Sequence, residues 1–576
     1  MSASLEHARD TRAPYDLIVV GAGINGLGIA RDAAARGLRT IVIDQEDICS
    51  GVSAWSGRLI HGGLRYLEHK DFALVRESLK ERERLFELAP HLVKPVPLLM
   101  PFYARNKRPP WLIRLGMIAY DVLSWDKKQP NHRILSRRSV LSRFAGMEPA
   151  GLTGSAVFID GQVEYAERLC VELAVAAQGD GADIVTHSRV DGLLRTDSHV
   201  TGVEYTDSIT GQRHSVLGRV VMNAAGPWVD RLLADFGDIE SPRFIGGSKG
   251  SHIIVDPFPG APLDVVYYES QADGRLVLVI PWMGRYLIGC TDNLFDDEPD
   301  SARAERSEID YLLNEVNTLV PGAELTVDSV LYTYSGVRPL PYAPGVPEWK
   351  IPRSHIIHDH AKDGVGGLFS VIGGKLTTFR QLSEDAVDLA VRSLGSKKTK
   401  TSTLTSPLPG ARVADYAAFS QAFVSDGSLP DNVSKRLLAL YGVRAATIAA
   451  LASDDANLAE IVDQDSGALA AEVVFAVRDE FARTLTDVMA RRLLLAFEPG
   501  HGISSAERIA TIMASIEGWD DERLRQEIDG YLVWLDHLAV PGRPAAQIPG
   551  RELDRERESG SSAGGAPSLT GGRAVS

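Results

Sequence analysis

A glycine-rich turn between two apolar runs near the start of the chain limits its possible folds more than any other feature. The spacing GxGxxG occurs at Gly21, Gly23 and Gly26, within the segment YDLIVVGAGINGLGIARDAAARGLRTIVID of residues 15–44. The apolar run before the glycines predicts a strand, the alanine-rich run after them a helix, and the run ending at Asp44 a second strand. A lone GxGxxG is weak evidence, but this complete context predicts a dinucleotide-binding α/β domain with a parallel sheet.

Each part of this motif has its own predicted role. Gly21 lets the chain turn, Gly23 lets the backbone approach a pyrophosphate at the helix N-terminus, and Gly26 allows the helix to pack closely on the strand. Asp44 is expected to accept hydrogen bonds from an adenosine ribose. A glycine turn that binds no nucleotide is the alternative interpretation. The predicted cofactor contacts of this unit are Gly21, Gly23, Ile24, Asn25, Gly26 and Asp44.

Two later segments favour FAD over NAD as the cofactor. Residues 367–380, GLFSVIGGKLTTFR, predict a strand, a glycine pair and a helix, which together aim backbone amides at the pyrimidine edge of a flavin. Residues 220–230, VVMNAAGPWVD, predict a strand that ends in small residues suited to packing on a cofactor, although a plain strand and turn would look the same. The predicted contacts here are Ala225, Gly226, Gly373, Gly374, Leu376 and Thr377.

Composition and charge exclude several classes of protein. The formal net charge of −15 argues against nucleic-acid binding, which needs a basic surface. The three cysteines lie far apart without a CxxC pair, which argues against a disulfide framework or a structural zinc site and fits a reducing compartment. No other metal site is predicted. Because we find neither an apolar signal segment nor a run of about 18 uncharged apolar residues, we expect a cytoplasmic protein without a spanning helix.

The 576 residues are too many for one hydrophobic core, so several domains are expected. We predict an α/β protein with a Rossmann-like FAD-binding domain, an antiparallel-sheet substrate domain and an all-α C-terminal domain. The FAD-binding domain is expected to be discontinuous, from residues 15–100, 150–242 and 350–395. The other predicted parts are the substrate-binding or cap domain at 101–149 with 243–349, the helical domain at 405–541 and a disordered tail at 542–576.

Seven motifs in one order resemble a known family. They are the glycine fingerprint, SxxSxRLIHGGLRYLEH, NAAGPWVD, KGSHIIVD, VIPW with IGCTD, YTYSGVRPL and GGKLTTFR. Together they resemble the FAD-dependent glycerol-3-phosphate dehydrogenases of the bacterial type, from about residue 15 to residue 395, and the helical C-terminal part also fits that family. The segment Ser50–Ser56 departs from the family, because Val52 and Trp55 stand where small hydroxyl residues are common.

The resemblance implies a reaction and an electron acceptor. Glycerol 3-phosphate would be oxidised at C2 to dihydroxyacetone phosphate by hydride transfer to FAD, and the electrons would pass to a membrane quinone. The enzyme would then bind the cytoplasmic membrane peripherally. A homodimer is left open.

The resemblance also gives a role to the polar stretch RLIHGGLRYLEH, residues 58–69. A glycine pair would weaken a helix by about 1 kcal/mol per glycine, so a reason for bare backbone is needed. We expect the pair to lie against the flavin ring, with the next turn at the mouth of a phosphate pocket. The expected cofactor contacts are Ser53, Ser56, His61, Gly62, Gly63 and Leu64, and the expected substrate contacts are Arg65 and Tyr66.

Three residues carry the expected chemistry. Arg338 is the first choice for the substrate phosphate, because the guanidinium fork suits a phosphate dianion, although a structural ion pair would leave the same trace in the sequence. Lys375 is expected to bind the phosphate beside it or to offset negative charge on reduced flavin. His252 is expected to take the hydroxyl proton, with His61 as runner-up, although a strand histidine is often only a satisfied polar residue.

Alternatives remain open at the level of function. An apolar helix with two tryptophans and basic flanks in Lys107–Lys128 fits either a bilayer interface or a buried helix of the cap domain. A glycerol-3-phosphate oxidase that uses O₂ has the same motifs. A flavin-holding scaffold without turnover is the third reading.

Overall fold

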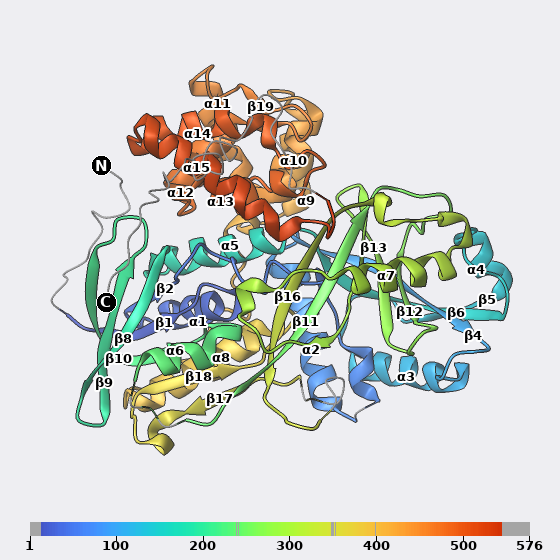
Figure 1. Ribbon diagram of the computed structural model, residues 1–576, viewed down its shortest axis with the longest axis horizontal. Helices are drawn as coiled ribbons and strands as arrows, with labels where there is room; N and C mark the ends of the chain where they lie inside the picture. The colour runs from blue at the N-terminus through green and yellow to red at the C-terminus, as the bar shows by residue number, and fades with distance from the viewer. Residues whose placement is uncertain are drawn as a thin grey trace, which may run out of the picture.

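The computed structural model describes residues 13–543, apart from residues 69, 238, 240, 347–350, 352 and 398 and the side chain of Arg65. The described chain forms two large sheets and a helical C-terminal region that covers one side of both (Figure 1). The predicted tail at 542–576 lies outside the described residues except for its first two positions.

The glycine fingerprint lies in a mostly parallel sheet. Strand β1 (Tyr15–Val20) pairs in parallel with β2 (Thr40–Ile43) on one side and with β10 (Arg213–Asn223) on the other. The sheet continues in parallel from β2 to β7 (Asp183–Val185) and from β10 to β18 (Leu368–Ile372). Because the carboxyl ends of parallel strands meet at one edge, the segments that follow β1, β2, β10 and β18 converge there. The antiparallel additions are β17 (Ile356–Asp359), β8 (Ser188–Thr196) and β9 (His199–Asp207).

Three helices cover one face of this sheet. Helix α1 (Ile24–Ala35) begins directly after the glycine turn and packs between α5 (Ala166–Gly179) and α8 (Phe379–Ser393). Their alanine-rich faces share one apolar core with β1 and β2. Small side chains allow this close approach, which fixes the start of α1 relative to the sheet edge. Helix α6 (Val229–Asp235) belongs to the core on the other face.

The second sheet is curled and mostly antiparallel, as the β-branched segments predicted. Its long central strands are β11 (Ile245–Val255) and β16 (Val330–Pro341), which pair from Ile245 with Pro341 to Val255 with Val330. The other strands are β3 (Leu59–Ile60), β4 (Val93–Tyr103), β5 (Arg133–Ser136), β6 (Leu152–Val163), β12 (Val265–Glu269), β13 (Leu276–Trp282), β14 (Arg285–Gly289) and β15 (Asn293–Leu294). Its helices are α2 (Phe72–Leu88), α3 (Pro110–Leu123), α4 (Arg137–Arg143) and α7 (Arg306–Leu319).

Strand pairing moves two boundaries relative to the sequence prediction, one near residue 100 and one near residue 150. Residues 15–100 and 150–242 were expected in the FAD-binding domain, but β4 and β6 pair with each other along Val93–Tyr103 within the second sheet. The two strands join the second sheet because β4 also pairs with β12, more than 160 residues later in the chain. Local sequence carries no sign of that long-range partner.

The C-terminal region is a helical bundle with one small hairpin. One stretch of it, Asp431–Asp454, is long and apolar enough to cross a membrane by length and composition, and 44% of its apolar 18-residue window is buried. It comprises two helices with a 3₁₀ turn between them, and its buried side chains belong to the bundle core. The elements are α9 (Tyr416–Ser425), α10 (Asp431–Tyr441), α11 (Ala445–Asp454), β19 (Ile461–Asp463), β20 (Ala468–Leu469), α12 (Ala470–Asp479), α13 (Leu485–Asp487), α14 (Ile503–Glu517) and α15 (Asp521–Trp534).

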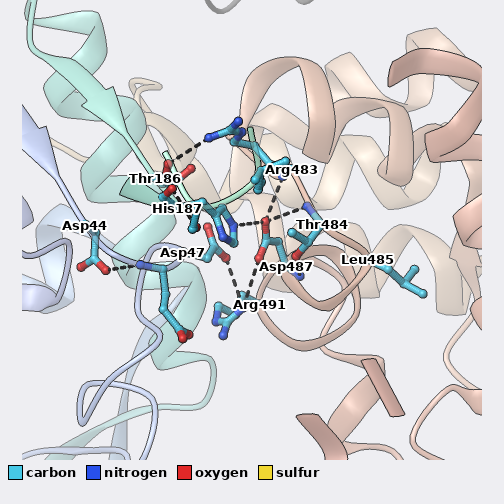
Figure 2. A network of polar contacts seen from close by, with 12 residues as sticks. Asp44, Asp47, Thr186, His187, Arg483, Thr484, Leu485, Asp487 and Arg491 are labelled. Carbon is cyan, nitrogen blue, oxygen red and sulfur yellow. Dashed lines mark hydrogen bonds and ion pairs between the residues drawn. The ribbon is translucent and has the colours of Figure 1, made fainter. Parts of the chain in front are cut away.

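Buried ion pairs attach this bundle to the FAD-binding part. His187, after β7, lies 2.9 Å from the carboxylate of Asp487 (Figure 2). Asp47, after β2, accepts two hydrogen bonds from Arg492 at 2.7 and 2.8 Å. Burial lowers the pKa of His187, but the charge and the hydrogen bond of Asp487, together with the charge of Asp47, outweigh burial, so the net pKa is raised. Since Asp47 follows the predicted ribose ligand Asp44 by three residues, the bundle buttresses the edge of the sheet where the nucleotide motif ends.

Candidate active site

One cavity of about 390 Å³ extends from the carboxyl edge of the parallel sheet to the second sheet. It contacts all three segments that were predicted to hold a dinucleotide: the turn after β1, the small residues after β10 and the glycine pair after β18. It also contacts β11 and β16 of the second sheet. The predicted residues in its lining are Gly21, Gly23, Ile24, Asn25, Asp44, Ser53, Ser56, His61, Tyr66, Ala225, Gly226, His252, Arg338, Gly373, Gly374, Lys375, Leu376 and Thr377.

The three fingerprint glycines differ in what surrounds them. Gly21 has φ +112°, and a Cβ there would lie 2.6 Å from the carbonyl oxygen of Ala224. A Cβ on Gly26 would lie 1.9 Å from the oxygen of Gly21, so Gly26 serves helix packing and does not line the cavity. Gly23 has φ −76°, and its nearest neighbour would be the Ser53 hydroxyl at 3.4 Å. The space beside Gly23 is therefore open to a ligand, whereas the space beside Gly21 and Gly26 is filled by the fold.

The ribose and pyrophosphate end contains polar groups held ready for a nucleotide. The Asp44 carboxylate accepts hydrogen bonds from the amides of Ala22 at 2.5 Å and Glu46 at 2.9 Å, and burial raises its pKa to about 6. The Oδ1 atom of Asn25 is buried and has no hydrogen-bond partner in the described chain. The Ser53 hydroxyl accepts a hydrogen bond from the amide of Ile24 at 3.1 Å. An unpartnered amide oxygen beside an open glycine fits the FAD that the motif predicts.

The glycine pair after β18 meets the fingerprint directly. Gly373 and Gly374 have φ +77° and +92°, and the Asn25 side-chain amide donates to the carbonyl of Gly373 at 3.4 Å. A Cβ on Gly374 would lie 2.6 Å from that amide nitrogen. The hydroxyl of Thr377 accepts a hydrogen bond from the amide of His61 at 3.1 Å, which ties the segment to the predicted flavin-proximal run. Backbone positions more than 300 residues apart thus form one wall of the cavity.

The second-sheet end of the cavity is cationic. The Arg338 guanidinium lies 3.1 Å from Asp292 Oδ1, 3.3 Å from Ser248 Oγ and 2.9 Å from Cys290 Sγ, so neighbours on three sides fix its position. Lys375 Nζ donates to Ser78 Oγ at 2.9 Å and lies 4.3 Å from the centre of the Tyr66 ring. Burial lowers the pKa of Lys375 to about 7. A buried ammonium with so few anionic neighbours is poised to gain stability from an anionic ligand.

His252 lies on β11 and lines the cavity. Burial, together with the positive charges of Arg338 and Arg58, lowers its pKa to about 3. Its Nδ1 atom is buried and finds no hydrogen-bond partner among the described residues. The ring lies 4.8 Å from that of Tyr334, and Gly289 leaves the ring its room because a Cβ there would be 2.3 Å away. The imidazole is therefore neutral in the free protein at neutral pH.

The structure gives the glycine pair of residues 62 and 63 a different steric reason from the one expected. A Cβ on Gly62 would lie 2.3 Å from the Tyr120 hydroxyl, which accepts the amide hydrogen of Gly62 at 3.0 Å. Gly63 has φ +73°, and a Cβ there would strike the ring of Tyr66. Neither glycine nor Leu64 lines the cavity. The predicted contact Arg65 lies outside the described side chains.

Sequence reasoning missed several lining residues. Arg353 and Cys290 line the cavity, and Arg353 Nη2 lies 3.5 Å from Asp292 Oδ2, on the carboxylate that also holds Arg338. Arg353 is in an irregular segment without a recognisable motif. Its positive charge before the motif GGKLTTFR was the only sequence feature that could have indicated a place in the site. Asp292 stands in the motif IGCTD, two residues after Cys290. A polar residue at the end of an apolar strand could have indicated a side chain near the site.

Comparison with known proteins agrees with this architecture. A family model described as FAD dependent oxidoreductase matches residues 16–380, and a model described as the C-terminal domain of alpha-glycerophosphate oxidase matches residues 401–524. The chain is 44% identical over 537 residues to a glycerol-3-phosphate dehydrogenase of a Synechocystis species, covering 92% of this chain and 97% of that one. It is 35% identical over 488 residues to D-erythritol 1-phosphate dehydrogenase of Brucella abortus, covering 83% and 93%.

A solved structure has the same arrangement of domains. The glycerol-3-phosphate dehydrogenase of Bacillus halodurans, complexed with FAD, matches with a TM-score of 0.77 and 26% identity, covering 93% of this chain and 97% of that one. The predicted fold class and the predicted cofactor, FAD, are confirmed by these matches.

Proposed function

The chain belongs to the FAD-dependent glycerol-3-phosphate dehydrogenase family, and on that premise we propose that it oxidises sn-glycerol 3-phosphate to dihydroxyacetone phosphate and passes the electrons to a membrane quinone. One observation carries the proposal: a single cavity joins the nucleotide motif to His252, Arg338 and Lys375. When bound there, FAD supplies the two-electron acceptor for the oxidation at C2.

The cationic end of the cavity has the chemistry of a phosphate site. The Arg338 guanidinium offers a planar fork that is already held by Asp292, so little side-chain freedom is lost when a phosphate binds. Lys375 adds a second cation, and the charge of a phosphate would raise its pKa from about 7 and keep the amine protonated. Arg353 shares the Asp292 carboxylate and adds positive charge at the same end.

We assign to His252 the role of taking the proton of the substrate hydroxyl. It lines the same cavity as the nucleotide motif and Arg338, and its Nδ1 atom is buried without a hydrogen-bond partner among the described residues. A pKa of about 3 makes it a weak base in the free enzyme. Since the charge of Arg338 contributes to that low pKa, a phosphate on Arg338 would raise the pKa of His252 and strengthen the base when substrate is present.

Anaerobic titration of the FAD-loaded protein tests the reaction. Glycerol 3-phosphate should remove the visible absorbance of the oxidised flavin, and glycerol should do so only at far higher concentration because it lacks the phosphate. Erythritol 1-phosphate serves as the matched control for chain length. An unchanged flavin spectrum with all three compounds would favour a scaffold without turnover and overturn the proposal.

An exposed apolar face of α3 supports a membrane quinone as the electron acceptor. On α3 the side chains of Ile113, Met117 and Tyr120 are buried, whereas Trp111 is 66% exposed and Val122 is 65% exposed. The exposed apolar residues of this face are Trp111, Leu112, Leu115, Ile118 and Val122, with Trp125 just beyond the helix. Figure 1 places α3 at the side of the molecule opposite to the C-terminal bundle. Exposed tryptophans and aliphatic side chains on one helix face suit a lipid interface, where a quinone is available.

Vesicle co-sedimentation tests this surface. Leu115→Asp with Ile118→Asp should abolish binding to lipid vesicles and lower turnover with a vesicle-embedded quinone, while turnover with a soluble dye stays unchanged. Val533→Asp is the matched control, because Val533 is an equally exposed apolar residue on α15. Equal binding of both variants would contradict the role of α3. Faster turnover with O₂ than with quinone would favour the oxidase alternative, which the name of the C-terminal family model supports.

A further inference from the structure

Two histidines and one carboxylate converge at the turn between β17 and β18, outside the active-site cavity. His358 stands near the end of β17, and His360 and Asp363 belong to the 3₁₀ turn η7 (His360–Asp363). His358 Nε2 lies 2.7 Å from Asp363 Oδ2, and His360 Nδ1 lies 2.8 Å from the same oxygen. One candidate ligand atom from each of the three residues lies within 4.8 Å of the other two.

Packing holds both rings in place. The ring of Phe244 lies 4.7 Å from that of His358 and 5.7 Å from that of His360. His360 is fully buried, and its other nitrogen, Nε2, lies 2.9 Å from the hydroxyl of Ser370 on β18. This outer hydrogen bond fixes the orientation of the ring, as the partners of metal-bound histidines do in other proteins.

A second group, of one histidine and two aspartates, shows by contrast why this one suits a cation. Asp47, His187 and Asp487 also lie close together, but Asp47 accepts two hydrogen bonds from Arg492 and lies 3.5 Å from Arg491 (Figure 2). Those guanidinium groups would repel a metal ion. In the described part of the chain, Asp363 has ion pairs only with the two histidines.

We propose that His358, His360 and Asp363 bind one transition-metal ion, with Zn²⁺ as the best match. Two imidazoles and one carboxylate are a usual donor set for Zn²⁺, and three protein ligands leave a fourth position open. His358 and Asp363 are partly exposed, which gives an ion a route of entry.

The position of the proposed metal site indicates that a bound ion would stabilise the fold next to the active-site cavity. His358 pairs with Ser370 across β17 and β18, and the chain runs from Ser370 to the glycine pair at 373–374 in three residues. Phe244, which packs on both imidazoles, directly precedes β11, the strand of His252. A bound ion would therefore hold the β17–β18 hairpin together. The hairpin packs there against Phe244, where the chain enters β11 of the second sheet.

Metal titration of the purified holoenzyme tests the proposal. After chelator treatment, Zn²⁺ should bind by calorimetry with a stoichiometry of one per chain and raise the Tm, and Co²⁺ should give absorbance at wavelengths beyond the flavin bands. His358→Ala and Asp363→Asn should each lose stoichiometric binding and the Tm shift, and both should keep full FAD content. Ser370→Ala should weaken binding about tenfold through loss of the outer hydrogen bond.

His214→Ala is the control, because His214 stacks on Tyr205 of β9 and is not a member of this group. It should bind Zn²⁺ as the unmodified chain does. Failure of the unmodified chain to bind one ion overturns the proposal, and so does equal binding by the unmodified chain and by both ligand variants, since the ion would then lie elsewhere.

Discussion

Replacing Arg338 by alanine tests the assignment of the phosphate pocket. Arg338 is paired with Ser248 across β11 and β16, and its guanidinium contacts Ser248 Oγ and Asp292 while lining the cavity. In the variant, Asp292 keeps Arg353 and Ser248 as partners, so the carboxylate is not left buried and unpaired. We therefore expect the fold and the FAD content to survive.

The magnitude follows from the lost hydrogen bonds. A hydrogen bond to a charged group contributes about 1.5–3 kcal/mol, and about 1.4 kcal/mol corresponds to a factor of ten. Arg338→Ala should therefore lower kcat/KM for glycerol 3-phosphate by roughly ten- to hundredfold. Arg338→Lys should recover only part of the loss, because an ammonium group does not reproduce the two-pronged contact.

The decisive assay compares two substrates. Steady-state kcat/KM is measured for glycerol 3-phosphate and for glycerol, together with FAD content. Glycerol has no phosphate, so its already low kcat/KM should change little in Arg338→Ala. Equal losses on both substrates would refute the reasoning, because Arg338 would then act on the chemistry at C2 or on the flavin, and Lys375 would have to hold the phosphate.

Three further outcomes follow from the structure. Gly23→Ala should yield folded protein without FAD, because the new Cβ meets only Ser53 at 3.4 Å but blocks the pyrophosphate; retention of FAD by absorbance would contradict this placement. For the free enzyme kcat/KM should fall as pH rises above about 7, where Lys375 loses its proton, and Lys375→Arg should move that fall to higher pH; an unchanged pH profile would remove Lys375 from phosphate binding. Since the folded pKa of His187 is raised, its ion pair with Asp487 stabilises the fold fully below pH 6.5 and is lost as pH rises through the folded pKa. The Tm difference between the unmodified chain and His187→Gln should therefore be largest in acid and shrink in alkali; a constant difference would contradict the ion pair.

The sequence by itself determined the nucleotide half of this protein. Gly21 and Gly26 are required by a turn and by helix packing within one local unit, so their spacing predicted the strand, the helix and the edge at which we place FAD. Motif order extended that prediction to His252, Arg338 and Lys375, which the structure places in one cavity. These residues were accessible because each stands inside a recognisable local pattern.

Only the tertiary structure decided the features that depend on distant partners. The absence of a side chain at Gly62 is required by Tyr120, 58 positions later, and not by anything in the motif itself. Whether the apolar helix α3 was buried or exposed depended on how it packs against the second sheet. The grouping of His358 with Asp363 depends on the packing of Phe244 and on the register of β17 against β18. Side-chain nitrogens converge only when strand pairing brings them together.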